Sequence, residues 1–495
     1  MRRIAIAFLV LLTACHRQKE ADWPTYGGNK QENRYSALTQ ITPSNVNDLK
    51  PVWVYHAVDT DKRTQRETQC QPIVVGNTLY GTTPRMQLFA LDPATGAQKW
   101  IFDPHTNRYN QNRGVVYWNS TILYTVGPTL FEIDVETGRP VQTFGDSGHI
   151  SLYTGLDINH PVNNLFLDAT SPGIIYKDIF IIGSTVSESG DAAPGYVRGF
   201  DARTGTLKWT FHTIPQPGEP GYETWPKDAY QWAGGTNAWA GMALDEKRRT
   251  VYFGTGSPSS DFYGGDRAGK NLYANCVVAL DAETGHLKWY YQTIHHDLWD
   301  RDIPCPPNLT TITHDGKKMD VVVQATKDGF VYVLDRDNGA SIFPVEERPV
   351  PTQGLPGEKP WPTQPYPLKP APFCAQDITD SDMTDLSPDA RRYVQKEFAQ
   401  YQHGNKFLPP STQGTLLVGY SGGAEWGGNA VDTDGVLYQN GNNAIWVLQM
   451  ISLEERRKEV ASLSAGQAIF MENCASCHGA DRKGNGKEIP SLLHT

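Results

Sequence analysis

The sequence contains no long run of basic residues and no apolar run long enough to span a membrane. Acidic residues outnumber basic residues by 54 to 44, so no strong positive field is available to neutralise a phosphate backbone. We therefore expect no nucleic-acid partner. Glycine (46) and proline (34) stay below the level of a disordered low-complexity chain, while 13 Trp and 23 Tyr in 495 residues can fill a large core.

The N-terminus has the features of an export signal. Two arginines precede an apolar run at residues 4–12, which is too short to cross a bilayer. The Leu-Thr-Ala-Cys sequence that follows resembles the bacterial lipobox. We expect residues 1–15 to form a lipoprotein signal peptide, with Cys15 lipidated and the protein anchored to a membrane in the periplasm or at the cell surface. The alternative is an ordinary cleaved signal peptide, which also implies export.

Cysteine is scarce, with seven residues in the chain. Cys15 belongs to the export signal, and two others form a motif near the C-terminus. The remaining four are Cys70, Cys276, Cys305 and Cys374. They either form disulfides in an oxidising compartment or remain buried thiols, and four cysteines allow several pairings.

A short pattern recurs along the chain: Leu or Phe, then Asp-x-x-Thr-Gly, then Trp four positions after the glycine. It occurs at residues 91–100, 200–209 and 280–289, with degenerate copies that begin at 133 and 334. An Asp-x-x-Thr-Gly turn between β-rich stretches predicts a hairpin. Repeated hairpins of this spacing predict small antiparallel sheets arranged radially, as in a β-propeller.

Composition shifts divide the chain. The segment 343–410 begins with a proline-rich stretch and ends in a predicted helix, which we place as an insertion in the propeller. A last β unit lies at residues 414–448, and the chain then becomes helical. The predicted domains are therefore a propeller at 22–450 and a second small module at 464–495.

The second module contains the c-type haem attachment pattern, Cys474-Ala-Ser-Cys477-His478. The two thiols would bond the haem vinyl groups and His478 would ligate the iron. Zinc binding or dithiol redox chemistry are the alternatives for such a cysteine pair. No methionine follows His478 to serve as the second axial ligand. We expect a cytochrome c-like domain that is truncated at the end of this sequence.

The densest charged segment is residues 295–302, which contain two adjacent histidines and three aspartates. Adjacent side chains on an extended segment point to opposite faces, so the histidines are a poor chelating pair. Asp300 and Asp302 share a face and are able to act together on one cation or one substrate hydroxyl.

Six blocks in order give the chain a family resemblance. They are 23–28 (WPTYGG), 112–115 (NRGV), 170–172 (TSP), 234–239 (GGTNAW), 296–300 (HDLWD) and 326–329 (TKDG). The set resembles the pyrroloquinoline quinone (PQQ)-dependent dehydrogenases, in particular glucose-dehydrogenase-like quinoproteins that carry a cytochrome c segment. The resemblance implies an all-β fold, namely an eight-bladed β-propeller with PQQ on its axis, followed by an α-helical cytochrome c segment. We expect the propeller to be incomplete in this chain.

The resemblance also implies roles for single residues. Asp300 would take the proton of a substrate alcohol, and Lys327 would hydrogen-bond the quinone oxygens. The predicted cofactor-binding residues are Trp239, which would stack on the PQQ ring, and Arg113, Thr170, Thr185 and Trp426. The predicted ligands of Ca²⁺, or of another divalent or trivalent metal, are Glu188, Asp300 and Asp302.

The implied activity is oxidation of an alcohol, sugar or polyol, with electrons passing from PQQ to haem c and then to a respiratory cytochrome or quinone. Departures from the family pattern are Ser257 where a metal-binding Asn is common, Gln69 where Glu is common, and a missing vicinal cysteine pair. Two other hypotheses remain open at this point: a non-catalytic propeller lipoprotein that acts as an envelope scaffold, and an inactive fragment of a quinohaemoprotein.

Overall fold

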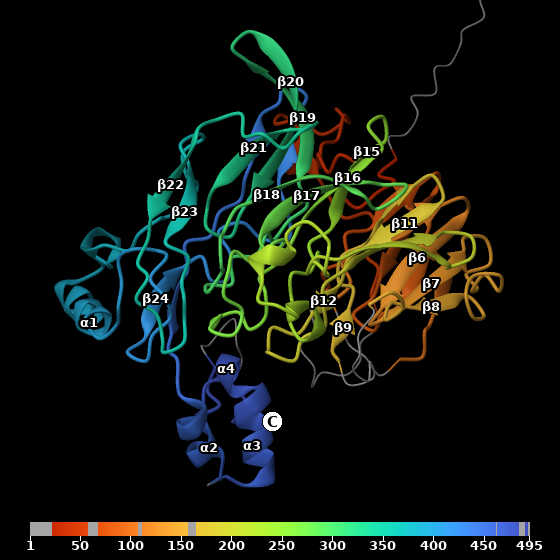
Figure 1. Ribbon diagram of the computed structural model, residues 1–495. Coiled ribbons are helices and arrows are strands. Elements are labelled where there is room, and N and C mark those ends of the chain that lie inside the picture. Colours follow the sequence, from red (N-terminus) through yellow and green to blue (C-terminus); the bar gives the residue numbers. More distant parts are fainter. Residues whose placement is uncertain are drawn as a thin grey trace, which may run out of the picture.

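The computed structural model describes residues 22–57, 68–106, 111–156, 165–461, 463–484 and 491–493 (Figure 1). Small antiparallel sheets make up most of this part of the chain, and a group of short helices lies below them at the C-terminal end. The predicted signal peptide, residues 1–15 with Cys15, lies outside the described residues. No helix in the described ranges combines the length and apolar character that crossing a membrane requires.

Four sheets share one construction, with four antiparallel strands each. The first contains β1 (Ile73–Val75), β2 (Thr78–Thr82), β3 (Leu88–Leu91) and β4 (Gln98–Phe102), and the second contains β5 (Val116–Trp118), β6 (Thr121–Val126), β7 (Thr129–Asp134) and β8 (His149–Ser151). The third contains β10 (Ile174–Tyr176), β11 (Ile179–Ile182), β13 (Val197–Asp201) and β14 (Leu207–Phe211), and the fourth contains β15 (Met242–Asp245), β16 (Thr250–Gly254), β17 (Cys276–Asp281) and β18 (Leu287–Gln292).

The remaining sheets are smaller. A three-stranded sheet contains β19 (Asn308–His314), β20 (Lys317–Ala325) and β21 (Val331–Asp335). The strand pairs are β9 (Leu167–Asp168) with β12 (Thr185–Val186), β22 (Val345–Pro349) with β23 (Thr363–Pro367), β24 (Thr415–Val418) with β27 (Ile445–Leu448), and β25 (Ala430–Val431) with β26 (Leu437–Tyr438). The α-helices are α1 (Pro388–Phe398), α2 (Leu453–Ala461), α3 (Ala465–Asn473) and α4 (Ala475–His478), and short 3₁₀ turns lie at Val46–Asp48, Tyr222–Thr224, Ala229–Gln231 and Asp380–Asp382.

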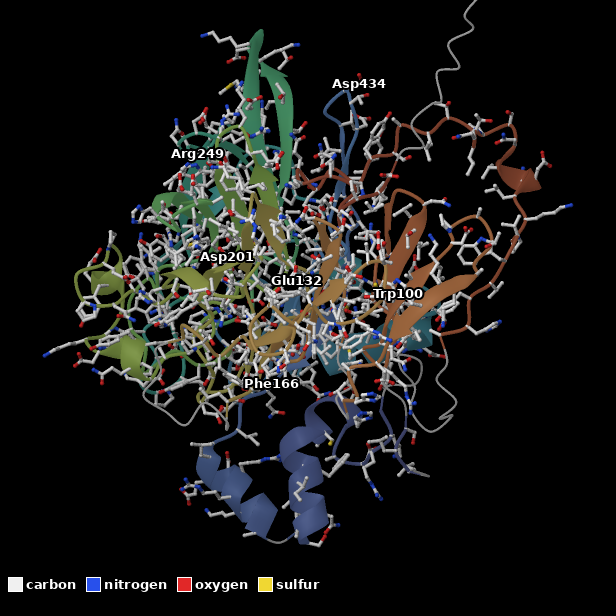
Figure 2. All side chains as sticks on the ribbon, turned by 90° about the vertical axis from the view of Figure 1, so that its right-hand side faces the viewer. Trp100, Glu132, Phe166, Asp201, Arg249 and Asp434 are labelled. Carbon is white, nitrogen blue, oxygen red and sulfur yellow. The ribbon has the colours of Figure 1, made fainter. Side chains whose placement is uncertain are left out.

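The recurring sequence pattern locks neighbouring sheets together. In the turn after β21, Asp335 Oδ1 accepts hydrogen bonds from the next backbone amides, and Gly339 adopts a φ of +73°. The indole of Trp289, from β18 of the preceding sheet, packs on Gly339, and its Nε1 donates to the carbonyl of Arg336. The same packing recurs between Trp53 and Gly96, Trp100 and Gly138, and Trp209 and Gly285. Figure 2 shows side chains filling the space between the sheets, with Trp100 and Asp201 labelled on separate sheets.

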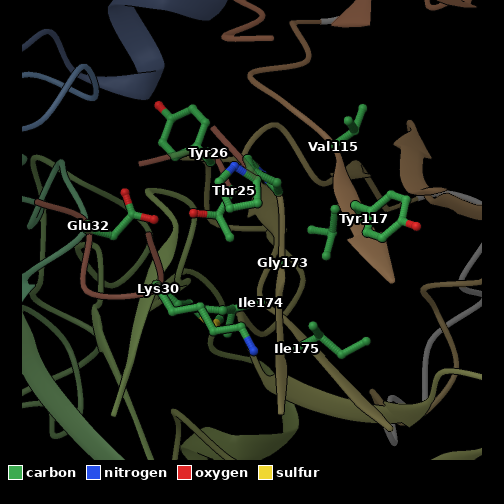
Figure 3. Close-up of a pocket in the computed structure, with 13 residues that line it drawn as sticks. Thr25, Tyr26, Lys30, Glu32, Val115, Tyr117, Gly173, Ile174 and Ile175 are labelled. Carbon is green, nitrogen blue, oxygen red and sulfur yellow. The ribbon is translucent and has the colours of Figure 1, made fainter. Parts of the chain in front are cut away.

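The N-terminal segment 22–34 connects sheets that are distant in sequence. Its backbone hydrogen-bonds strand β1 through Trp23, β15 through Lys30 and β19 through Gln31. A small cavity of about 40 Å³ lies between this segment and strands β5, β10 and β15 (Figure 3). Glu32 lines this cavity, and burial raises the pKa of its carboxyl to about 7, against the opposing effect of Arg34.

The prediction of a mostly-β, propeller-type fold is confirmed, whereas a count of eight blades remains a prediction. The segment 343–410, predicted to be an insertion in the propeller, contains β22, β23 and helix α1. The helix begins at Pro388, and the side chain of the preceding Ser387 accepts a hydrogen bond from Ala390 N. The segment 464–495 contains helices α3 and α4 within its described residues.

Substituting Gly339 by alanine tests the packing between sheets. The new Cβ would lie 2.5 Å from the Trp289 ring, whereas Gly316, with the same φ of +73°, has open space around it. We expect Gly316→Ala to lower the free energy of unfolding by about 1–2 kcal/mol through backbone strain alone. Gly339→Ala should lower it by about 3 kcal/mol or more, since the Trp289 ring must also move. Equal losses in urea unfolding would contradict the packing role.

The pKa of Glu32 predicts a pH dependence of stability. Because its pKa is about 7 in the folded protein and near 4.5 when exposed, the folded state holds a proton that the unfolded state releases between these values. Stability should therefore fall, by about 1.4 kcal/mol per pH unit, as the pH rises from 4.5 to 7. Glu32→Gln should reduce the measured slope by this amount in unfolding experiments, because other buried carboxyls such as Glu132 also have raised pKa values. The exposed Glu136→Gln should leave the slope unchanged.

Candidate active site

A cavity of about 230 Å³ collects loop residues from separate sheets. Each functional side chain stands at or just beyond the end of a strand: Thr170 after β9, Thr185 and Glu188 at β12, Trp239 before β15, Ser257 and Asp261 after β16, Asp302 after β18, and Lys327 between β20 and β21. Sequence analysis named all of these as site residues except Ser257 and Asp261. Ser257 was noted only as a departure from the family pattern. The fold brings the whole set together around one cavity.

Asp300 and Lys327 form the charged centre of the site. Lys327 Nζ lies 3.0 Å from both carboxylate oxygens of Asp300, and both side chains are about one-tenth exposed. Burial raises the pKa of Asp300 well above its usual range, with Asp302 and Glu188 adding to the effect and Lys327 opposing it. Burial alone would lower the pKa of Lys327, but the surrounding carboxylates outweigh it and raise that pKa.

The backbone around this pair is tightly constrained. Asp300 itself has a φ of +55°, which is uncommon for a residue with a side chain and concentrates at functional sites. The turn that contains Lys327 is not a solvated hairpin. The Lys327 carbonyl accepts a hydrogen bond from Gly423 N at 2.7 Å, and the neighbouring Asp328 is buried and pairs with Lys406 at 2.9 Å.

Asp302 fixes the indole of Trp239. Its Oδ2 accepts a hydrogen bond from Trp239 Nε1 at 2.7 Å, and its Oδ1 accepts from Ser257 Oγ at 2.8 Å and from the Ser257 amide. The same hydroxyl also lies within hydrogen-bond distance of Asp297 Oδ2, so the two carboxylates share its single proton. The serine therefore links two carboxylates of the 295–302 loop to the strand β16.

Asp297 organises the rest of that loop. Its oxygens accept hydrogen bonds from the amides of Trp299 and Arg301 and from Asn275 Nδ2. The two histidines face different partners: His295 Nε2 contacts Glu347, and His296 Nε2 contacts Glu358. The two rings therefore point in different directions, as expected for adjacent side chains on an extended segment.

Arg113 reaches the opposite end of the cavity. Its guanidinium donates to Thr170 Oγ1 at 2.9 Å and to Gln69 Oε1 at 2.9 Å, and Thr170 Oγ1 lies 2.9 Å from Thr185 Oγ1. The same guanidinium lies 5.2 Å from the ring centroid of Trp239 and 4.8 Å from that of Trp426. The five predicted cofactor-binding residues of the propeller therefore lie in one contiguous group.

Glu188, Asp300 and Asp302 remain the predicted metal ligands. In the described part of the chain, the side chains of His, Cys, Asp and Glu do not form a group of three that could hold a metal ion as they stand. Two of the predicted ligands have protein partners. Both oxygens of Asp300 bond to Lys327, and those of Asp302 bond to Ser257 and Trp239. Glu188 lines the cavity, and burial, followed by the charge of Asp302, raises its pKa.

Two residues of the site were missed by sequence analysis. Asp261 is buried in the cavity wall, and Tyr420 lies where Asp300 and Glu188, after burial, raise its pKa to about 12. Neither belongs to a repeated or recognisable pattern. Only the three-dimensional arrangement of the loops reveals them.

The haem attachment motif lies on the C-terminal helices. Cys474 follows helix α3, and Cys477 and His478 belong to helix α4; the side chain of Cys477 lies outside the described residues. A cavity of about 450 Å³ in the same segment is lined by residues that include Phe470, Met471 and Arg482.

The residues of the propeller cavity fit PQQ, a flat quinone that bears carboxylates. A fixed indole face suits a flat ring, and Arg113 with two threonine hydroxyls suits an anionic edge. Lys327 supplies a permanent positive charge for the quinone oxygens. A guanidinium, two hydroxyls and an ammonium around one cavity favour an anionic ligand over an uncharged one.

Comparison with known proteins identifies the family of the chain. The family described as "Glucose/ethanol/alcohol dehydrogenase, beta-propeller domain", of PQQ proteins, matches residues 23–483. The quinoprotein glucose dehydrogenase of Escherichia coli is 36% identical over 442 residues, which cover 83% of this chain and 54% of that protein. Quinoprotein glucose dehydrogenase A of Acinetobacter calcoaceticus is 34% identical over 484 residues, 89% of this chain and 60% of that protein.

Among solved structures, the quinohemoprotein alcohol dehydrogenase of Comamonas testosteroni matches with a TM-score of 0.64 and 26% identity, over 86% of this chain and 58% of that one. The chain thus spans between half and two thirds of the length of these relatives. Since the family match extends over most of the sequence, this chain belongs to the PQQ-dependent quinoprotein dehydrogenase family.

Proposed function

We propose that this chain forms the catalytic part of a PQQ-dependent dehydrogenase that oxidises the CH–OH group of an alcohol, sugar or polyol. The observation that carries the proposal is the Lys327–Asp300 pair, with both Asp300 oxygens 3.0 Å from the ammonium, beside a cavity that Trp239 lines. A scaffold protein would have no need of a buried carboxylate, ammonium and fixed indole around one cavity.

Different residues of the chain have different roles in such an oxidation. When bound, PQQ supplies the acceptor for the hydride that leaves the substrate carbon. Asp300 accepts the proton of the substrate hydroxyl, and its raised pKa matches it to that task. Lys327 holds the Asp300 carboxylate in place and keeps a positive charge in the cavity. Asp302 keeps the Trp239 indole in a single orientation, which favours stacking of a flat ring.

Binding of the cofactor's anionic edge falls to the group around Arg113. Its guanidinium, with the hydroxyls of Thr170 and Thr185, presents several donors at one end of the cavity. Trp426 stacks on the outer face of that guanidinium and holds it toward the cavity. Glu188, Asp300 and Asp302 would hold Ca²⁺ or another divalent or trivalent ion, whose charge would add to that of Lys327.

We further propose that haem c, attached at Cys474 and Cys477 and ligated by His478, receives the electrons and passes them to a respiratory acceptor. This proposal rests on the spacing of the two cysteines and the histidine in the sequence. Export and lipid anchoring at Cys15 are proposals that rest on the sequence of residues 1–15.

Asp300→Asn tests the proton acceptor. With PQQ and Ca²⁺ supplied, we expect kcat to fall by about 10²–10⁴-fold, because the amide cannot accept the proton. In the unaltered protein the rate should rise with pH through an apparent pKa above that of an ordinary carboxyl, since Asp300 must be ionised. The exposed Asp315→Asn should retain full turnover. Substantial turnover by Asp300→Asn would remove this residue from the role.

Absorbance tests the haem proposal. The protein expressed with a cytochrome c maturation system should show a Soret band that survives denaturation, because the haem is covalently attached. Replacing Cys474 and Cys477 together by alanine should abolish the band while leaving dehydrogenase activity with an artificial acceptor. A chain that matures without haem would contradict the proposal.

A further inference from the structure

Asp261 is a buried carboxylate for which the proposed mechanism has no use. Its side chain belongs to a residue that is 5% exposed, and it lines the cavity together with Glu188, Asp302 and Lys327. In the described structure its Oδ2 atom has no hydrogen-bond partner. A buried acceptor without a partner is costly, so a protein that keeps one beside a binding cavity has a ligand to meet it.

The loop holds Asp261 in a defined position. Ser259 Oγ donates to the Ser187 carbonyl at 3.1 Å, the Ser259 amide donates to Gly234, and Arg267 donates to the Ser260 carbonyl at 3.0 Å. Asp261 lines the same cavity as Lys327, whose ammonium lies 3.0 Å from the Asp300 carboxylate. Burial raises the pKa of Asp261, and the charges of Asp300, Glu188 and Asp302 add to the effect. The unpartnered acceptor therefore belongs to the same charged cluster as the group that receives the substrate proton.

An aromatic surface adjoins the same place. The ring of Phe262, the residue after Asp261, lies 5.6 Å from that of Tyr420, which lies 5.2 Å from that of Trp446. Trp446 is fixed by a hydrogen bond from its Nε1 to Ser421 Oγ at 3.0 Å. These rings support the loop from outside the cavity, whose own wall contains the Asp261 acceptor and the Trp239 ring. Such a wall suits a molecule that has hydroxyl groups as well as C–H groups.

A metal ion explains Asp261 less well. It needs several oxygen ligands, and the predicted set of Glu188, Asp300 and Asp302 does not include Asp261. A hydroxyl donor needs a single acceptor, which Asp261 Oδ2 provides.

We propose that Asp261 accepts a hydrogen bond from a second hydroxyl of the substrate, so that the site discriminates diols and larger polyols from monoalcohols. The inference rests on the proposed function, whose substrate it specifies. Asp261 is then a specificity residue: it touches the substrate but takes no part in the transfer of hydride or proton.

The experiment compares substrates that differ by one hydroxyl, with cyclohexanol against cis-cyclohexane-1,2-diol and 1-propanol against glycerol. Protein reconstituted with PQQ and Ca²⁺ is assayed with an artificial acceptor, as the unaltered chain, Asp261→Asn and Asp266→Asn. Asp266 lies in the same loop and is exposed, which makes it a matched control. Saturation-transfer NMR with the diol measures binding without turnover, and thermal unfolding reports the fold.

We expect Asp261→Asn to lower kcat/KM for the diol and glycerol by roughly 10- to 100-fold, mainly through KM, and to change the monoalcohol values less than about threefold. The diol signal in NMR should weaken in parallel. The midpoint of thermal unfolding should stay the same or rise, because the variant removes a buried carboxylate from the neighbourhood of three others. Asp266→Asn should match the unaltered chain.

An equal loss for diols and monoalcohols, or no loss for either, would overturn the inference and leave the proposed function standing. Loss of stability together with all activity would assign Asp261 a structural role and also overturn it. If the unaltered chain oxidises none of the substrates, the proposed function fails. NMR then decides the inference: diol binding that Asp261→Asn weakens supports the subsite, and binding that is absent or unchanged refutes it.

Discussion

The site depends on one buried ion pair, between Asp300 and Lys327. Four carboxyl groups, those of Glu188, Asp261, Asp300 and Asp302, act on one another around a single cavity, and Lys327 supplies positive charge among them. Without that ammonium the cavity would hold uncompensated negative charge at a high cost. The pair therefore lets an acidic site persist inside the protein, and it leaves a carboxylate whose proton affinity is high enough for a base.

Holding such groups together requires that the sheets do not shift relative to one another. Asp302 and Lys327 come from loops of neighbouring sheets, and the Trp289–Gly339 contact connects those same sheets outside the cavity. The N-terminal segment adds a second connection, since Lys30 and Gln31 hydrogen-bond β15 and β19. The loops are free to diverge in sequence because the turns and tryptophans, not the loops, hold the sheets in register.

This division explains what the sequence predicted and what it did not. The repeated Asp-x-x-Thr-Gly turn with its tryptophan is local, so the propeller-type fold was predictable from it, as was the helix that begins at Pro388 after Ser387. Asp300, Lys327 and Trp239 were found through resemblance in ordered blocks, and the structure groups them. The partners of Asp302, namely Trp239 and Ser257, were not predictable, because they are set by packing between loops. Asp261 was missed for the same reason.

The insertion at 343–410 has a physical role in this arrangement. It supplies Lys406 and Gln376, and Lys406 Nζ bonds to Asp328 at 2.9 Å and to Gln376 Oε1 at 2.7 Å while lying 3.7 Å from the centre of the Phe330 ring. Burial lowers the pKa of Lys406 to about 8, although the charge of Asp328 acts to raise it. Burying this ammonium therefore costs free energy. The contact fixes the turn that contains Lys327 and Asp328. Lys406 holds the Asp328 side chain, and the Gly423 amide holds the Lys327 carbonyl. The backbone of Lys327 then has no freedom to reorganise, and its positive charge stands ready where negative charge develops.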